Sequence, residues 1–229
     1  MPTPQERREA LKRLYLDEAR DCLRCPLSET RTQVVFGAGD ADADLMFVGE
    51  APGRSEDEAG LPFVGQAGKL LDRLLADIGL ERRQVFIANV LKCRPPNNRD
   101  PMPGEIEACQ DYLRRQVDLI EPRVICTLGN FSTKLLRADT TGITRLHGRP
   151  EVRTVGTRAV RLYPLYHPAA ALYTPSTLET LREDFARIPS LLKQPVEQPP
   201  EPVERPEPEE EPVAVGAATD DPSRQLGLF

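Results

Sequence analysis

The chain of 229 residues has no run of 18 apolar residues, the length that a membrane-spanning helix requires. Its N-terminus is charged and amphipathic, so we also exclude a secretory signal and a membrane partner. The five cysteines are odd in number and accompany no export signal, which argues against a disulfide framework and for a reducing compartment. We therefore expect a cytoplasmic protein. Histidine is scarce as well: the chain has only His147 and His167.

The negative charge is unevenly distributed. The net charge is −6, but the segment from Gln194 onward holds nine acidic side chains and two arginines, and so carries −7. The remaining 193 residues are close to neutral, so the acidity does not argue against a nucleic-acid partner. Eight of the last 36 residues are proline, and this composition cannot form a core. We expect a globular domain over 1–193, a disordered acidic linker over 194–224 and a short apolar peptide at 225–229.

Strand and helix patterns alternate along the first 193 residues. We expect strands at 44–48, 85–91, 124–128 and 159–166, and helices at 5–20, 69–78, 104–121, 129–136 and 175–192. Such alternation predicts an α/β fold: a single domain with a central, mainly parallel four-stranded sheet flanked by helices.

The connection from Gly49 to Gly68 has the composition of a ligand-binding loop. It contains five glycines, two prolines, four carboxylates and one aromatic residue, Phe63. Glycine allows the backbone to approach a ligand closely, and Phe63 offers a flat face for stacking. A plain surface connection of this length is uncommon.

Four chemically distinct residues follow the expected strands: Glu50, Asn89, Gly129 and His167. Ligands of open α/β sheets bind beyond the carboxyl ends of the strands, so we expect these residues to meet in one crevice. The Asn89 amide could read the edge of a base or simply cap a turn. His167 could equally be structural. His147 is expected to be a solvent-facing loop residue.

Four cysteines form a possible ligand set: Cys22-x2-Cys25 and Cys93-x15-Cys109. Thiolate pairs of this kind suit tetrahedral sulfur coordination of zinc or of an iron–sulfur cluster, and the spacing does not choose between them. Alternatively, Cys109 is a buried apolar residue and Cys93 a free thiol. Cys126 lies within a strand and is expected in the core.

Five separated motifs together resemble the family 4 uracil-DNA glycosylases. They are Gly49-Glu50-Ala51-Pro52-Gly53, Glu56-Asp57, Leu61-Pro62-Phe63-Val64-Gly65, Asn89 with Cys93-Arg94-Pro95-Pro96, and His167-Pro168-Ala169-Ala170. The resemblance runs from about Leu11 to Leu192. In that family the four cysteines are the ligands of a [4Fe–4S] cluster, which braces loops near DNA and takes no part in the chemistry.

The resemblance implies base-excision repair: the enzyme flips deoxyuridine out of uracil-containing DNA and hydrolyses its N-glycosidic bond. It implies that His167 donates a hydrogen bond to uracil O2, Asn89 pairs with the uracil edge and Phe63 stacks on the ring. Glu50 and Ala51 would form the wall that orients the base. We count Glu50 and Glu56 with His167 as catalytic candidates.

The chain departs from the best-known branch of the superfamily at Ala51, where that branch has a water-activating aspartate. Glu56 is the candidate that replaces it, and Asp57 a weaker one. After the histidine, Leu172 or Tyr173 could be the wedge that fills the gap left by the flipped nucleotide. The alternative is an ordinary loop before a helix.

The C-terminal peptide Gln225–Phe229 resembles the pentapeptide with which bacterial replication and repair proteins bind the sliding clamp, with Gly227 as a departure. We expect a monomer associated with the nucleoid. A second possibility is a uracil-DNA-binding or covalent sequestering protein of the same fold. Relatives that capture DNA covalently have a longer basic insertion ending in histidine, whereas Arg145-Leu146-His147-Gly148 is short.

Overall fold

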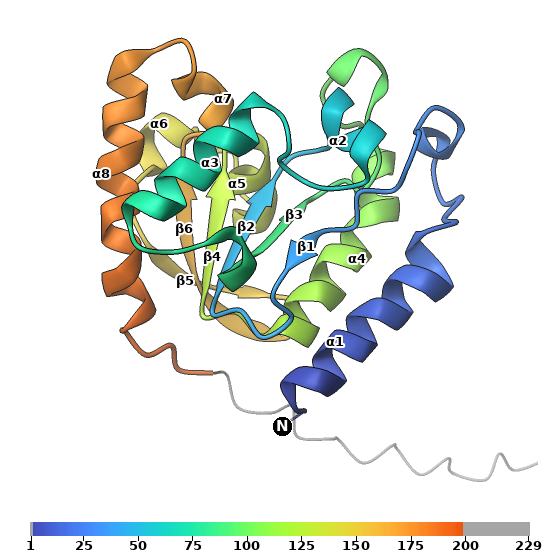
Figure 1. The fold of residues 1–229 in the computed structure, drawn as a ribbon, viewed down its shortest axis with the longest axis horizontal. Helices are drawn as coiled ribbons and strands as arrows, with labels where there is room; N and C mark the ends of the chain where they lie inside the picture. The colour runs from blue at the N-terminus through green and yellow to red at the C-terminus, as the bar shows by residue number, and fades with distance from the viewer. Residues whose placement is uncertain (1, 199–229) are drawn as a thin grey trace, which may run out of the picture. The chain divides into compact units, whose positions relative to one another are not determined.

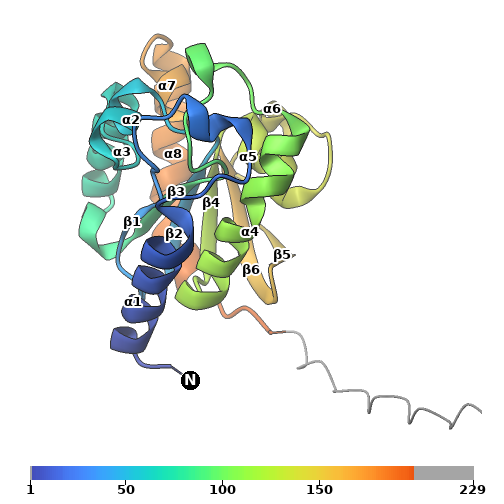
Figure 2. The same ribbon diagram turned by 90° about the vertical axis from the view of Figure 1, so that its right-hand side faces the viewer.

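A central mixed sheet carries helices on both faces in this computed structural model, which describes residues 2–198 (Figures 1 and 2). The strands are β1 (Ala38–Gly39), β2 (Leu45–Gly49), β3 (Phe86–Asn89), β4 (Val124–Leu128), β5 (Glu151–Val155) and β6 (Arg158–Leu165). The helices are α1 (Pro4–Arg13), α2 (Arg54–Ala59), α3 (Gln66–Asp77), α4 (Pro103–Ile120), α5 (Asn130–Arg137), α6 (Ile143–Leu146), α7 (Pro168–Ala171) and α8 (Pro175–Leu192). No helix in this range is both long and apolar enough to span a bilayer.

The expected fold class is confirmed, but the sheet has six strands instead of four, in the order β1-β3-β2-β4-β6-β5. The four central strands are the expected ones and are mutually parallel. The two edge strands are antiparallel to their neighbours. We missed them because β1 has only two residues and because β5, Glu-Val-Arg-Thr-Val, mixes charged residues with valines, so neither shows an apolar run.

The central strands are buried on both faces, as their continuous apolar sequences require. In β2, Met46 and Val48 face the core beneath α1 and α4, whereas Leu45 and Phe47 face the core beneath α3 and α8. Figure 1 shows α3 and α8 on one side of the sheet and α1 and α4 toward the other. Cys126 of β4 is fully buried, as expected.

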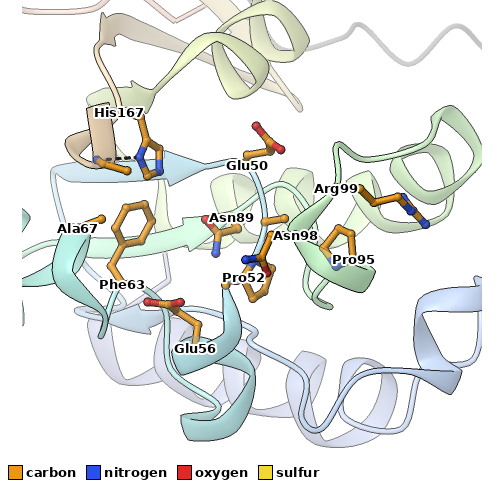
Figure 3. Close-up of a pocket in the computed structure, with 13 residues that line it drawn as sticks. Glu50, Pro52, Glu56, Phe63, Ala67, Asn89, Pro95, Asn98, Arg99 and His167 are labelled. Carbon is orange, nitrogen blue, oxygen red and sulfur yellow. Dashed lines mark hydrogen bonds between the residues drawn. The ribbon is translucent and has the colours of Figure 1, made fainter. Parts of the chain in front are cut away.

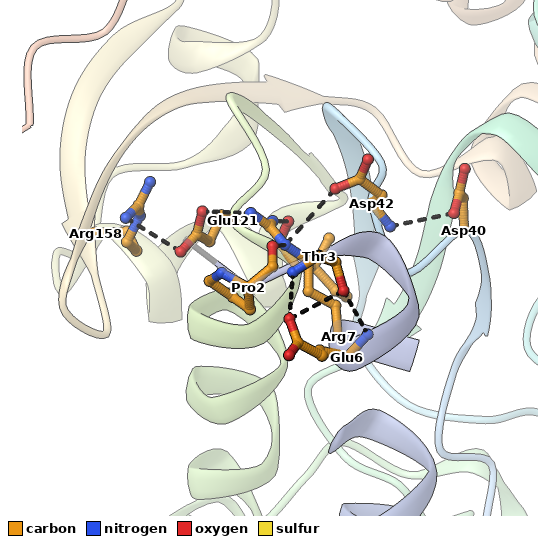
Figure 4. Close-up of polar contacts among 9 residues, drawn as sticks. Pro2, Thr3, Glu6, Arg7, Asp40, Asp42, Glu121 and Arg158 are labelled. Carbon is orange, nitrogen blue, oxygen red and sulfur yellow. Dashed lines mark hydrogen bonds and ion pairs between the residues drawn. The ribbon is translucent and has the colours of Figure 1, made fainter. Parts of the chain in front are cut away.

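The first helix is anchored to the C-terminal end of α4 by a buried arginine (Figure 4). Thr3 caps α1 through reciprocal hydrogen bonds with Glu6. Arg7 donates to the backbone carbonyl of Ile120 at 2.8 Å and to the carboxylate of Glu121 at 2.8 Å. The expected single helix over 5–20 is instead α1 followed by a π-helical segment, Leu14–Ala19, which leads to Cys22. A π-helical segment shifts the turn that follows it.

The end of the described chain packs against the start of β6. Arg161 donates to the carbonyls of Leu191, Gln194 and Pro195. The Gln198 side chain exchanges two hydrogen bonds with the backbone of Ala159. Residues 194–198, which we assigned to the linker, thus still contact the sheet. The rest of that linker and the peptide 225–229 lie outside the described residues.

Candidate active site

A cavity of about 440 Å³ lies at the carboxyl ends of β2, β3 and β6 (Figure 3). It is lined by Glu50, Ala51, Pro52, Gly53, Glu56, Phe63, Ala67, Asn89, Pro95, Asn98, Arg99, His167 and Ala169. The expected meeting of Glu50, Asn89 and His167 is therefore observed, and Phe63 joins them. Gly129 does not line the cavity. It packs behind the histidine, where a Cβ would lie 3.1 Å from the His167 Cβ.

The backbone of Phe63 adopts an unusual conformation that neighbouring residues hold in place. Its φ of +52° is in the left-handed region, which bulky residues rarely adopt. Arg82 donates to the Phe63 carbonyl at 2.9 Å and also to the Pro62 carbonyl. Gly68 contacts the same carbonyl so closely that a Cβ would lie 1.8 Å from it. These contacts fix the conformation of the loop at Phe63. The centroid of the Phe63 ring lies 5.6 Å from that of the His167 ring.

The Asn89 side chain is nearly inaccessible, at 2 % exposed, and its Oδ1 has no hydrogen-bond partner among the described residues. Leaving a buried acceptor unpaired costs about 1–3 kcal/mol. Gly49 lies against this amide, and a Cβ there would be 2.4 Å from Oδ1 and 2.8 Å from the Phe63 ring. Only glycine at position 49 leaves room for both side chains. Asn89 lines the cavity, and its unsatisfied oxygen is suited to accept an N–H group from a ligand.

His167 is held as a neutral donor. Its Nδ1 accepts a hydrogen bond from the backbone N–H of Ala169 at 3.1 Å, so the ring proton is on Nε2. Burial lowers the pKa of His167 to about 4, and the carboxylate of Glu56 opposes that shift. Near neutral pH the imidazole can therefore donate through Nε2 without carrying a charge.

The carboxylates around the cavity differ in their partners. Glu56 accepts hydrogen bonds from the backbone N–H groups of Val64 and Gly65, both at 2.9 Å and both through Oε1. Glu50 is partly buried, and burial together with the charge of Asp100 raises its pKa. Asp57 does not line the cavity, because both its oxygens accept the N–H of Thr32. Glu50 and Glu56 therefore remain candidates for activating a water in the cavity, whereas Asp57 does not.

The four cysteines of the expected ligand set lie in one region. Cys93 follows β3, Cys109 is on α4, and Cys22 and Cys25 pack on the same core. Hydrogen-bond donors surround the sulfurs: the Lys92 N–H lies 3.3 Å from the Cys109 Sγ, and Arg31 Nη1 lies 3.5 Å from the Cys93 Sγ. Burial raises the pKa of Cys109 to about 11, and the charges of Cys93 and Cys25 add to that shift.

The chemistry of the donor set fits a thiolate-bound metal group. Four cysteine sulfurs share one region, and N–H donors lie beside two of them, the Sγ atoms of Cys93 and Cys109. Such N–H donors stabilise metal-bound thiolates, and four thiolates are the ligands of an iron–sulfur cluster.

Comparison with known proteins assigns the family. The uracil-DNA glycosylase superfamily profile matches residues 36–189. The chain is 50% identical over 185 residues to a type-4 uracil-DNA glycosylase of Archaeoglobus fulgidus, across 78% of this chain and 92% of that protein. It is 49% identical over 180 residues to the Sulfurisphaera tokodaii type-4 protein (76% and 82% covered) and 46% over 184 residues to that of Saccharolobus solfataricus (78% and 85%). The chain belongs to the type-4 uracil-DNA glycosylases. The resemblance drawn from the five motifs is confirmed.

Sequence reasoning missed part of the cavity wall of this type-4 glycosylase. Pro95, Asn98 and Arg99 line the cavity from the proline-rich loop after β3. Arg99 is fixed there by Glu105, at 2.5 and 2.9 Å, and this hydrogen-bonded pair lowers the pKa of Glu105. The proline-rich sequence shows a loop, but no pattern in it indicates which side chains turn inward.

The two wedge candidates after His167, Leu172 and Tyr173, differ in their exposure to solvent. Leu172 is partly buried against the core beneath α3 and α8. Tyr173 is 88 % exposed. Of the two wedge candidates in this glycosylase, only Tyr173 projects into solvent.

The expectation for His147 was wrong. Its Nδ1 is 2.9 Å from a carboxylate oxygen of Asp184 on α8, and its ring stacks on Tyr166 with centroids 4.5 Å apart. The His147 side chain is therefore fixed by Asp184 and Tyr166 and does not point freely into solvent.

Proposed function

We propose that this protein excises uracil from DNA: it hydrolyses the N-glycosidic bond of an extruded deoxyuridine, releases uracil and leaves an abasic site. One observation carries the proposal. The unpartnered Oδ1 of Asn89 and the neutral His167 line the same cavity, beside the Phe63 ring. A pyrimidine with an N–H group and two carbonyls matches this combination of acceptor, donor and flat face.

Asn89 reads the base. Its Oδ1 accepts the N3–H of uracil and its NH₂ group donates to O4. Cytosine presents an amino group and an unprotonated ring nitrogen at these positions, so the fixed amide rejects it. Phe63 stacks on the ring, while Glu50 and Ala51 form the adjoining wall.

His167 stabilises the leaving group. As the glycosidic bond breaks, negative charge develops on uracil O2 and the sugar acquires oxocarbenium character. The Nε2–H of a neutral imidazole donates to that oxygen. A neutral donor is suitable because its proton stays on the histidine, so uracil departs as an anion.

Glu56 or Glu50 orients the attacking water. One oxygen of Glu56 is committed to the N–H groups of Val64 and Gly65, which leaves its second oxygen for water. A dissociative transition state needs only a modest base. The double variant Glu56→Gln/Glu50→Gln tests this role: turnover within threefold of wild type removes both residues.

Cys22, Cys25, Cys93 and Cys109 would hold a [4Fe–4S] cluster. Such a group would join the N-terminal segment, the loop after β3 and α4 by thiolate bonds. The loop after β3 lines the cavity through Pro95, Asn98 and Arg99, so these cysteines would hold one of the cavity walls in position.

On the DNA side we assign the wedge to Tyr173 because Leu172 is packed against the core. An exposed aromatic ring four residues after Ala169, which lines the cavity, can fill the space that an extruded nucleotide leaves. We further propose that the protein acts as a cytoplasmic, nucleoid-associated monomer, and that Gln225–Phe229 attaches it to a bacterial sliding clamp.

The deciding experiment incubates the purified protein, without added metal, with a uracil-containing oligonucleotide and a thymine-containing control. Subsequent alkali treatment should cleave only the uracil strand, because an abasic site is alkali-labile. A denaturing gel of the untreated sample separates the alternative. A stable protein–DNA adduct without turnover identifies a covalent sequestering protein and contradicts the proposal.

A further inference from the structure

Lys92 is a buried cation that the mechanism above does not use. It lies between β3 and Cys93 and is 1 % exposed. Its ammonium donates to the Asn89 backbone carbonyl at 2.8 Å and to Oε1 of Gln116 at 2.6 Å. Burying a charge is costly unless it is compensated, and an apolar side chain of similar size would avoid that cost. The position of this lysine therefore calls for a specific reason.

Among the described residues, no carboxylate pairs with this ammonium. None of the ion pairs formed within residues 2–198 includes Lys92. Its backbone N–H donates to the Cys109 Sγ at 3.3 Å, and Cys93 is the next residue of the chain. Lys92 thus belongs to the surroundings of the four cysteines through its backbone.

The Lys92 ammonium also contacts the backbone of Asn89, the residue that we propose reads the base. The N–H groups of Val90 and Leu91 bond to the carbonyls of Gly49 and Glu50, so the chain after β3 continues along β2. The carbonyl of Asn89 points the opposite way, toward β1. However, β1 pairs only with Phe86 and Ile87 and has ended before Asn89. The Lys92 ammonium supplies the donor that a neighbouring strand would otherwise provide.

Gln116 makes the arrangement rigid. It is fully buried on α4, and its Oε1 accepts from Lys92 while its Nε2 donates to the Phe36 carbonyl at 2.9 Å. The Lys92 carbonyl accepts the N–H of Val35 at 2.7 Å. Both ends of residue 92 are thereby fixed to the segment before β1 and to α4.

We propose that Lys92 is a positioning residue for base recognition: its ammonium fixes the end of β3, and with it the direction of the Asn89 amide, and links this amide to the four-cysteine site. The inference rests on the proposed role of Asn89 in reading uracil. An amide distinguishes donor from acceptor only if it is held in one orientation. Loosening the end of β3 should therefore weaken binding of the base while contacts to the DNA backbone persist.

The test compares Lys92→Met with Arg161→Met in the intact protein. Arg161 is also a buried cation that donates to backbone carbonyls, but it lies at the opposite end of the sheet from the cavity. Two dissociation constants are measured well below the unfolding temperature: that of free uracil by ligand-observed NMR, and that of an abasic-site duplex by fluorescence anisotropy. For Lys92→Met we expect free uracil to bind about fivefold to tenfold more weakly, with duplex affinity within twofold of wild type. Arg161→Met should change neither constant.

Wild-type uracil affinity in Lys92→Met overturns the inference, as does an equal loss of both affinities. Asn89→Ala separates this failure from failure of the proposed function. If Asn89→Ala also binds uracil normally, the base-reading role is wrong. If it binds uracil weakly while Lys92→Met binds normally, only the role of Lys92 is wrong. Should Lys92→Met not fold, Gln116→Met decides, because it removes the second ammonium contact: a twofold to threefold weaker uracil affinity supports the inference, and an unchanged one overturns it.

Discussion

Replacing His167 with asparagine separates the hydrogen bond that its Nδ1 accepts from the one to uracil O2 that we propose for its Nε2. The Oδ1 of asparagine takes nearly the position of the histidine Nδ1, so it can still accept the N–H of Ala169 and cap α7. Asparagine is too short to reach where Nε2 lies, so the donor to uracil O2 is lost. The His167→Asn variant therefore keeps the local fold and removes only the chemistry.

The expected loss follows from the role of a single donor to a developing oxyanion. Removing one such donor costs about 3 kcal/mol, which corresponds to about a 10²–10³-fold lower rate. Single-turnover excision from a uracil oligonucleotide measures the chemical step directly. His167→Ala should lose as much rate, and in addition about 1 kcal/mol of unfolding free energy because the cap is gone. An asparagine variant within threefold of the wild-type rate would refute the reasoning.

The pH dependence tests whether the donor is neutral. Because burial lowers the pKa of His167 to about 4, the imidazole is uncharged from about pH 5 upward, and the single-turnover rate should not fall between pH 5.5 and 8 on its account. A rate that declines through this range would indicate a cationic donor. The lowered pKa also makes the stability of the protein depend on pH. The histidine of the unfolded chain titrates near pH 6.5, so its contribution to the unfolding free energy is complete above that pH and decreases as the pH falls toward 4. His167→Asn should lose this slope in denaturant titrations.

Three further substitutions or deletions have definite expected outcomes. Asn89→Asp should lower uracil excision at least tenfold and raise the ratio of cytosine to uracil excision, because a carboxylate accepts from cytosine N4 but cannot donate to uracil O4; an unchanged ratio contradicts this. Gly68→Ala should destabilise the protein by more than ~2 kcal/mol in urea unfolding and slow excision, since its Cβ would meet the Phe63 carbonyl, whereas Gly104→Ala meets nothing within 4 Å and should be neutral. Deleting 225–229 should abolish capture on an immobilised sliding clamp and leave excision from a short oligonucleotide unaltered; retained capture would exclude the peptide.

The parallel core could be predicted because its strands are apolar on both faces. Leu45–Val48 has no polar position, and such a run followed by a glycine-rich turn and an amphipathic helix indicates a βα unit. The order of the strand ends then predicts that Glu50, Asn89 and His167 meet. β1 and β5 escaped prediction because edge strands are short or polar and depend on a neighbour for their conformation.

The contacts that hold the site were less accessible to sequence reasoning. His147 and Asp184 are 37 residues apart, and nothing local to either indicates the other. The sequence around Lys92 indicates an exposed loop lysine. In the structure its ammonium is buried because Gln116 of α4 accepts its hydrogen bond. Such pairings depend on tertiary packing, which local periodicity does not encode.

The last described residues are held far from the cavity along one strand. Gln198 lies against Ala159, at the amino end of β6, and Arg161 donates to the carbonyl of Pro195 just before it. The cavity lies at the carboxyl end of the same strand, where His167 follows Leu165. The contacts that fix residues 194–198 therefore share no residue with the cavity wall.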